Sequence, residues 1–125
     1  MGRIRQMIKV DGREFWTLFD TGARNTYVVP AVARLMTRRK MAGVFRSAIG
    51  GKTQKSDTMV LLEARVHGHL IGTRALVVDD IGEDEDGKPI EILFGALAMQ
   101  EWGIRPIPDE ERLDLSHYTR TFVEF

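Results

Sequence analysis

The feature that most constrains the fold is an uncharged, largely apolar run that ends in an acid. Residues 15–19 read FWTLF, and Asp20 follows directly. Alternate side chains of a β-strand point to opposite faces, and large apolar residues occupy both faces of this run. A strand that is apolar on both faces belongs in the middle of a sheet. The sequence therefore predicts a central strand that ends at Asp20, close to the core.

Most of the remaining chain also reads as short strands. Asp11-Gly12 suits the positive φ angles of a tight hairpin turn, and glycine-containing turns are expected at Gly50-Gly51 and at residues 67–69. The strands are expected within residues 6–10, 13–19, 26–29, 43–54, 58–80, 89–95 and 119–125. Short helices are predicted over residues 30–36 and 96–102, the first ending near the basic residues 37–40 and the second at Gly103. Residues 81–88 and 105–118 are expected to be loops.

The expected architecture is mainly β, with about seven to nine strands and one or two short helices. A length of 125 residues suits one domain, with a core over about residues 5–105 and a C-terminal tail over residues 106–125. The chain has no apolar run of about 20 residues that could span a membrane. Its first ten residues lack the apolar stretch of a secretory signal, so a cytoplasmic location is the default expectation.

No cofactor or metal is expected. The chain has no Cys, which excludes disulfides, thiolate nucleophiles and Cys-ligated metals. His67 and His69 flank a turn without a third ligand in register. The acidic stretch over residues 79–91 does not have the spacing of an EF-hand calcium loop, so a surface loop is the better interpretation.

The charges are unevenly distributed along the chain. Residues 21–56 contain eight Lys or Arg residues and no acid, although the net charge of the whole chain is zero. The basic segment can be a solvated face, or a rim that attracts acidic peptide or nucleic acid. A nucleic-acid partner is not expected, because exposed aromatic residues are not interleaved with the bases.

The segment Asp20-Thr21-Gly22-Ala23, at the end of an apolar strand, resembles the signature of the retropepsin-like aspartic proteases. Three further features follow in the order of that family: a helix-like stretch, a glycine-tipped hairpin with the sequence AIGGKT, and Leu93-Phe94-Gly95 before a short helix. The resemblance covers about residues 5–105. It implies a closed β-barrel lobe and the hydrolysis of peptide bonds by a water molecule held between two carboxylates. Such a pair shares one proton, because two adjacent like charges do not both ionise easily.

The resemblance also implies roles for individual residues. The catalytic residues would be Asp20, Thr21 and Gly22, and a flap near residues 46–54 would cover a peptide bound as an added strand. The residues expected to contact substrate are Ala23, Arg24, Ala48, Ile49, Gly50 and Gly51. The chain contains only one Asp-Thr-Gly segment. The expected active form is therefore a homodimer with Asp20 from each copy at the two-fold axis, and residues 121–125 are a candidate dimer strand.

The sequence departs from the family at two places that tie the active-site loop to the dimer. Arg24 stands where retroviral members commonly have an acid, and Ala96 and Leu97 follow Gly95 where an Arg and then Asn or Asp are common. Arg24, with Arg46, Lys52 and Lys55, predicts a preference for acidic side chains in the substrate. The alternative function is a binding or regulatory module that keeps the fold without useful turnover.

Overall fold

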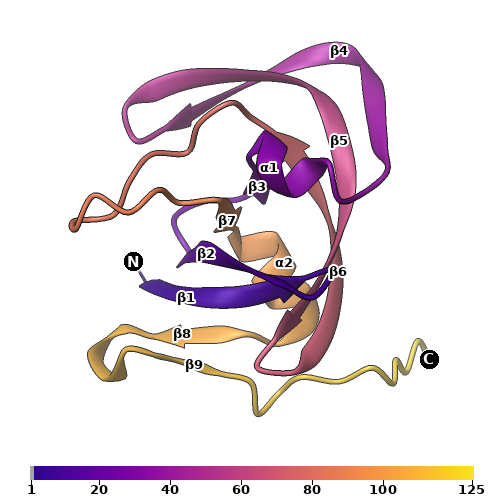
Figure 1. Ribbon diagram of the computed structural model, residues 1–125. Helices are drawn as coiled ribbons and strands as arrows, with labels where there is room; N and C mark the ends of the chain where they lie inside the picture. The colour runs from indigo at the N-terminus through magenta and orange to yellow at the C-terminus, as the bar shows by residue number, and fades with distance from the viewer. Residues whose placement is uncertain (1) are drawn as a thin grey trace.

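The computed structural model describes residues 2–125, which form a mainly β structure with short helices (Figure 1). The first six strands are β1 (Arg3–Val10), β2 (Arg13–Asp20), β3 (Tyr27–Val28), β4 (Arg38–Ile49), β5 (Lys52–Val66) and β6 (His69–Val77). They are followed by β7 (Ile92–Phe94), β8 (Arg105–Ile107) and β9 (Arg112–Asp114). The α-helices are α1 (Pro30–Ala33) and α2 (Ala96–Trp102), and a 3-10 turn covers Pro108–Glu110. The predicted fold class is confirmed.

Seven strands form one sheet in the order β1-β2-β7-β3-β6-β5-β4. A further pairing between β1 and β5, at Lys9 and Arg65, closes this sheet into a ring. β2 lies between β1 and β7, with which it pairs antiparallel and parallel respectively. The predicted central position of the strand that ends at Asp20 is therefore confirmed.

The β1–β2 hairpin has the tight turn that its sequence predicts. Asp11 and Gly12 have φ angles of 52° and 75°, as a two-residue primed turn requires. A turn of this length fixes the register along the whole hairpin. It places Arg3 directly opposite Asp20.

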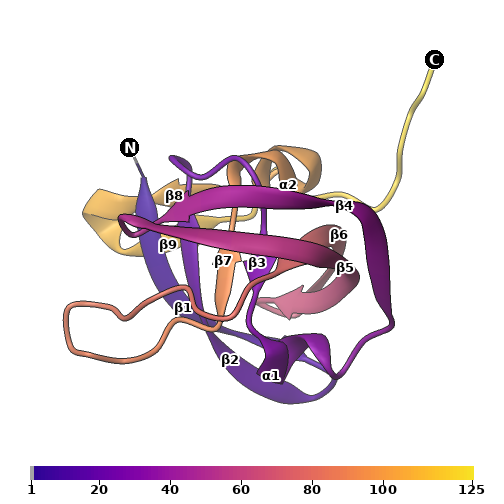
Figure 2. The ribbon, with the colours of Figure 1, turned by 90° about the horizontal axis from the view of Figure 1, so that it is seen from above.

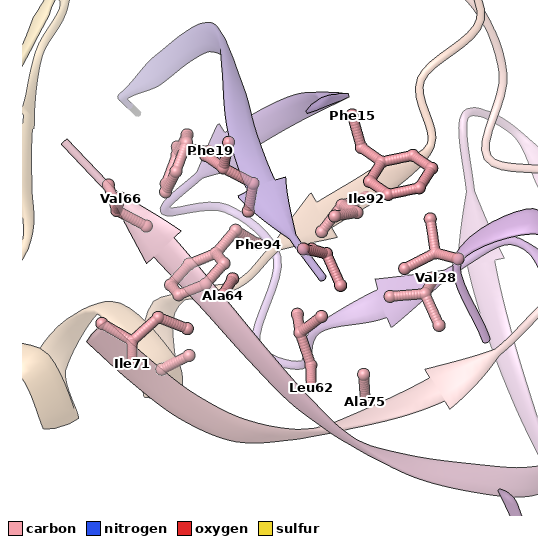
Figure 3. Close-up of a cluster of buried hydrophobic side chains, with 14 of the residues drawn as sticks. Phe15, Phe19, Val28, Leu62, Ala64, Val66, Ile71, Ala75, Ile92 and Phe94 are labelled. Atoms are coloured by element: carbon pink, nitrogen blue, oxygen red, sulfur yellow. The ribbon is translucent and has the colours of Figure 1, made fainter. Parts of the chain in front are cut away.

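The main core fills the ring of strands. It includes Phe19 and Phe94, which are fully buried, with ring centroids 4.9 Å apart. Figure 3 shows that side chains from β2, β3, β5, β6 and β7 point into this cluster. A second buried cluster lies beside it and consists of Tyr27, Ile49, Val78, Ile81, Ile90 and Leu93. The burial of Phe19 and its neighbours gives the end of β2 a rigid base.

Two further turns and one helix end agree with the sequence predictions. Gly50 and Gly51 have φ angles of 57° and 80° at the tip of the β4–β5 hairpin. His67 and Gly68 likewise have positive φ angles between β5 and β6. Gly103 ends α2 in the left-handed conformation, which glycine adopts without a steric cost.

Two local predictions of secondary structure are wrong. α1 ends at Ala33, and the basic residues from Arg38 begin β4, where they pair with β5. Residues 105–114, expected as a loop, form the β8–β9 hairpin, and Leu113 is buried in the main core. The core thus extends beyond residue 105, and β8 and β9 find a partner in each other rather than in the main sheet.

The final segment forms no strand within the chain. Residues 121–125 have no regular structure and lead away from the body (Figure 2). The rings of Phe122 and Trp102 are inclined at 64° with centroids 5.9 Å apart, whereas Phe125 is fully exposed. The intrachain strand expected over residues 119–125 is therefore wrong. Neither α-helix in residues 2–125 has the length and apolar character needed to cross a membrane.

Candidate active site

Asp20 is the last residue of β2 and is largely buried. Its side chain is 10% exposed. The backbone N–H of Gly22 donates a hydrogen bond of 2.8 Å to Asp20 Oδ1, and Arg3 Nε lies 3.2 Å from Oδ2. Both carboxylate oxygens thus have a donor, as a buried charged group requires. The acid is placed by a rigid strand and oriented by the turn that follows it.

Residues 20–26, here called the Asp20 loop, begin as a tight turn. The N–H of Ala23 donates to the carbonyl oxygen of Asp20 at 3.1 Å. Thr21 is bound to Gly2 through two groups: its N–H donates to the Gly2 carbonyl at 2.9 Å, and its hydroxyl accepts from the Gly2 N–H at 2.8 Å. Thr21 therefore braces the start of the loop within the same chain.

The first residues of α2 hold the other half of the Asp20 loop. The N–H groups of Ala96 and Leu97 donate to the carbonyl oxygens of Ala23 and Arg24, at 2.7 and 3.2 Å. The N–H groups of the first helical residues have no acceptor inside the helix, so the loop carbonyls satisfy them. The loop thus has a main-chain connection to α2 within the same chain.

The close approach between loop and helix depends on Gly95. Its N–H donates to the buried hydroxyl of Thr26 at 3.1 Å. A Cβ atom at this position would lie 2.2 Å from the carbonyl oxygen of Asn25, which is well inside contact distance. The glycine before α2 is therefore required by packing against the Asp20 loop.

Asp20 opens into a groove of about 690 Å³. Gly22 and Ala23 line it from the Asp20 loop, and Ala48, Ile49 and Gly50 line it from the tip of the β4–β5 hairpin. Its apolar walls come from Leu18, Ile81, Ile90 and Leu93. The structure thus brings six of the nine predicted site residues into one groove.

The tip of the β4–β5 hairpin is packed against the groove. Ile49 is 9% exposed and belongs to the second apolar cluster, with Ile81 among its members. The Tyr27 hydroxyl donates to Ser47 Oγ at 2.8 Å, and Lys52 Nζ lies 3.9 Å from Asp80. Figures 1 and 2 show the tip and the β6–β7 connection at the same side of the molecule. These contacts hold the tip over the groove in the single chain.

The other predicted site residues lie outside this groove. Thr21 and Gly51 are exposed and do not line it. Arg24 lines a separate groove of about 610 Å³, whose apolar residues include Phe45, Leu61 and Leu97. Arg46, Lys52 and Lys55 do not line the Asp20 groove either. The four bases that led us to expect a preference for acidic substrates are therefore not placed at this site.

Sequence reasoning missed an acidic wall of the groove. Residues 79–91, here called the acidic loop, were predicted only as a surface loop, but Glu83, Asp84 and Glu85 line the groove. Asp84 Oδ2 accepts a hydrogen bond of 2.9 Å from Trp16 Nε1, and Glu85 forms an ion pair with Arg5. No local sequence pattern predicts this hydrogen bond between Trp16 and Asp84.

The carboxylate of Asp84 is held by several donors. Its Oδ1 accepts the N–H groups of Lys88 and Asp86, both at 2.9 Å. The bond from the Lys88 N–H, with those from Trp16 and Asp86, lowers the pKa of Asp84 below its ordinary value of 3.8. Asp84 is therefore ionised at neutral pH and organises the loop around itself.

Sequence reasoning also missed Arg3, although a signal for it existed. The two-residue turn at Asp11-Gly12 pairs residues whose numbers add to 23, so Arg3 must lie opposite Asp20. Extending the predicted hairpin to its end would have found this neighbour. Arg3 is 66% exposed, so its guanidinium can leave Asp20 without disturbing the core.

Comparison with known proteins indicates the fold. No protein-family model matches the chain, and no curated protein matches its sequence. Among solved structures, the chain is similar to the retroviral protease-like domain of Ddi1 from Leishmania major, with 15% identity, a TM-score of 0.63, and coverage of 93% of this chain and 90% of that one. It is also similar to EIAV protease bound to the inhibitor HBY-793, with 23% identity, a TM-score of 0.60, and coverage of 84% and 92%.

A third similar structure is simian foamy virus protease, with 14% identity, a TM-score of 0.51, and coverage of 82% of this chain and 99% of that one. The chain therefore has a retropepsin-like fold. At these identities the similarity concerns the fold alone.

Proposed function

We propose that the protein is an aspartic endopeptidase that is active as a homodimer. The observation that carries this proposal is the position of Asp20: a buried acid at the end of a central strand, facing a groove, in a loop held by main-chain bonds. The retropepsin-like fold supports the same reaction class. Because the chain has only one Asp-Thr-Gly segment, the second carboxylate comes from a second copy.

In the proposed reaction, one Asp20 of the pair is ionised and the other is protonated. The ionised carboxylate takes a proton from a water molecule, whose oxygen attacks the carbonyl carbon of the peptide bond. The protonated carboxyl donates to the carbonyl oxygen as the tetrahedral intermediate forms. The carboxyl that took the proton of the water then donates it to the departing nitrogen, and the C–N bond breaks. The products are a carboxylic acid and an amine.

The surrounding residues have distinct parts in this proposal. Gly22 and Ala23 bring the backbone of the Asp20 loop to the edge of the groove, where an extended peptide can lie. Ala48, Ile49 and Gly50 form the tip of a flap over residues 46–54, which closes on the peptide and excludes water. The tip contacts of Ile49 and Lys52 have to loosen for the peptide to enter.

Arg3 has to leave Asp20 when the pair forms. Two neighbouring carboxylates share a proton because both cannot carry a charge easily. A guanidinium 3.2 Å from Oδ2 stabilises the ionised form of Asp20 and so opposes the sharing of a proton. We therefore propose that dimer formation displaces the exposed Arg3 side chain.

The decisive experiment compares wild type with Asp20→Asn and Asp57→Asn on a peptide library, from about pH 4 to about pH 8. Asp57 is a suitable control because it also precedes a Thr but lies in β5, outside the Asp20 groove. Asp20→Asn should lower kcat/KM about 1,000-fold or more, since it removes an acid–base pair, whereas Asp57→Asn should leave cleavage unchanged. Cleavage that survives Asp20→Asn would refute the mechanism.

The homodimer is tested by measuring specific activity and sedimentation over the same range of protein concentrations. We expect both to rise together, because each active site needs two chains. Full specific activity in samples that sediment as a monomer would contradict this part of the proposal.

A second candidate is a peptide-binding module without turnover. It is favoured by the contact of Arg3 with Asp20, which neutralises the acid in the single chain. Wild type that binds extended peptides but cleaves none of them, at any pH of the library experiment, would support this alternative over the peptidase.

A further inference from the structure

The charges that line the Asp20 groove are not balanced. Six charged side chains contribute: Arg3, Arg5, Asp20, Glu83, Asp84 and Glu85. Each of the two bases faces one acid, because Arg3 contacts Asp20 and Arg5 contacts Glu85. Among residues 2–125, Glu83 and Asp84 are the acids of the groove that form no ion pair, although Arg5 also attracts Asp84 electrostatically.

Asp84 is already committed to holding the acidic loop. Its two oxygens accept hydrogen bonds from Trp16 Nε1 and from the N–H groups of Asp86 and Lys88. None of these donors carries a charge, so the bonds keep the carboxylate ionised without neutralising it. Asp84 thus contributes negative potential to the groove but has little freedom to bind a ligand.

Glu83 is the acid of this wall whose carboxylate is free to bind a ligand. Within residues 2–125 its carboxylate has no ion pair and no hydrogen bond to a side chain or to the backbone. Its backbone is held by a β-bridge to Pro89, and its carboxylate lies beside Gly87 of the same loop. It is exposed to solvent.

The wall next to Glu83 is apolar. Ile81 and Ile90 are buried in the second cluster and line the groove together with Leu18. A long aliphatic stem can pack on such a surface while its charged end reaches a carboxylate. Lys and Arg are the side chains with this form, whereas a Glu side chain would meet a groove whose lining has four acids and two bases.

We propose that Glu83 is a specificity-determining residue that selects peptides with a Lys or Arg side chain near the cleaved bond. The stem of that side chain packs on Leu18, Ile81 and Ile90, and its cation pairs with Glu83. This inference rests on the proposed function, since it assumes that the peptide lies in the Asp20 groove. It reverses the expectation from the basic residues of the sequence, which lie elsewhere.

The test is a binding experiment on a chain that cannot turn over its ligand. Asp20→Asn protein is titrated, by fluorescence anisotropy, with labelled extended peptides that carry Lys, norleucine or Glu at each position in turn. Norleucine has the apolar stem without the charge. At one or more positions the Lys peptide should bind about two- to fivefold more tightly than the norleucine peptide, as expected for a partly exposed ion pair.

Glu83→Gln, added to Asp20→Asn, should abolish the difference between Lys and norleucine and leave norleucine binding unchanged. Asp86→Asn is the matched control, because Asp86 lies on the same loop but does not line the groove. The Lys preference of the parent should also disappear at about 1 M salt, where charges are screened beyond about 3 Å.

The inference would be overturned by equal binding of Lys and norleucine peptides at every position, by an equal effect of Glu83→Gln on both peptides, or by the same effect from Asp86→Asn. Absence of any peptide binding would overturn it too. The results that refute the proposed peptidase function differ from those that refute the role of Glu83. Wild type that cleaves peptides without a basic preference refutes the role of Glu83 alone, whereas Lys-selective binding without cleavage supports Glu83 and refutes the peptidase.

Discussion

The Asp20 loop and the acidic loop line the same groove, but they are held in different ways. The Asp20 loop is tied to other parts of the chain by main-chain donors: Ala96 and Leu97 bind its carbonyls, and Thr21 binds Gly2. Within residues 82–90, the main-chain bonds of the acidic loop stay inside the loop, as between Ile90 and Gly82. That stretch reaches the rest of the chain through side chains, chiefly Asp84 to Trp16 and Glu85 to Arg5.

The two kinds of contact differ in how far they depend on individual side chains. Main-chain bonds do not depend on which side chains are present, so the placement of Asp20 tolerates the unusual residues Arg24, Ala96 and Leu97. Side-chain bonds depend on each residue, so the charge of the opposite wall can change without disturbing the acid. Substitutions in the two loops should therefore have different consequences.

The largest effect is expected at the junction of the Asp20 loop with α2. In Gly95→Ala the new Cβ would lie 2.2 Å from the carbonyl oxygen of Asn25, so loop and helix must separate. We expect the free energy of unfolding to fall by about 3 kcal/mol, measured by urea denaturation, together with a loss of any peptidase activity.

Gly43→Ala is the control for this substitution. Gly43 lies in β4 and has no positive φ, and a methyl group added there would meet no atom within 4 Å beyond its chain neighbours. It should change the free energy of unfolding by less than about 0.5 kcal/mol. Equal stabilities of the two variants would show that the close approach at Gly95 does not constrain the fold.

A smaller and more local effect is expected from Trp16→Phe. The variant keeps an aromatic ring but removes the Nε1 donor to Asp84. We expect Tm to fall by only a few degrees, while amide exchange becomes faster at Asp86 and Lys88, whose N–H groups bind Asp84.

Trp102→Phe provides the comparison, because it also removes an indole donor, here to the Gly72 carbonyl. It should lower Tm without changing exchange in the acidic loop. Faster exchange at Asp86 and Lys88 in both variants would mean that the loop responds to global stability rather than to Trp16.

The smallest effect is a pH dependence of stability from Asp84. Its pKa is lowered in the folded chain, by the Lys88 N–H above all. The unfolded chain therefore binds more protons near the ordinary pKa of 3.8, and the stabilising contribution of Asp84, present above that pH, is lost as pH falls through the lowered pKa.

We expect wild type to be more stable than Asp84→Asn above pH 3.8, and the difference to shrink as the pH decreases further. Urea midpoints at a series of pH values measure it. A constant difference between wild type and Asp84→Asn at all pH values would contradict the assignment.

Local sequence signals predicted much of the fold correctly. The turns at Asp11-Gly12 and Gly50-Gly51 and the helix stop at Gly103 each follow from the backbone freedom of one or two residues. The predictions failed where the outcome depends on a partner. The alternating residues 119–125 find no strand to pair with inside the chain, whereas residues 105–114 fold back and pair with each other.

The sequence by itself determined the position of Asp20 at the end of β2 and its neighbour across the hairpin. An apolar run with a two-residue hairpin before it requires a central strand, and the hairpin register sets Arg3 against Asp20. These are short-range consequences of side-chain alternation and of the φ angles at one turn. They can be read without knowing any other part of the molecule.

Only the tertiary structure decided which charges face that acid. The acidic loop reaches the groove because Trp16 binds Asp84 across 68 positions of sequence, and the β4–β5 tip reaches it because Ile49 packs against Ile81 in the second cluster. Neither contact follows from a local pattern, since both depend on how the ring of strands closes. The basic residues of segment 21–56 suggested a positively charged site. In the folded chain Glu83 lines the groove, whereas Arg24, Arg46, Lys52 and Lys55 do not.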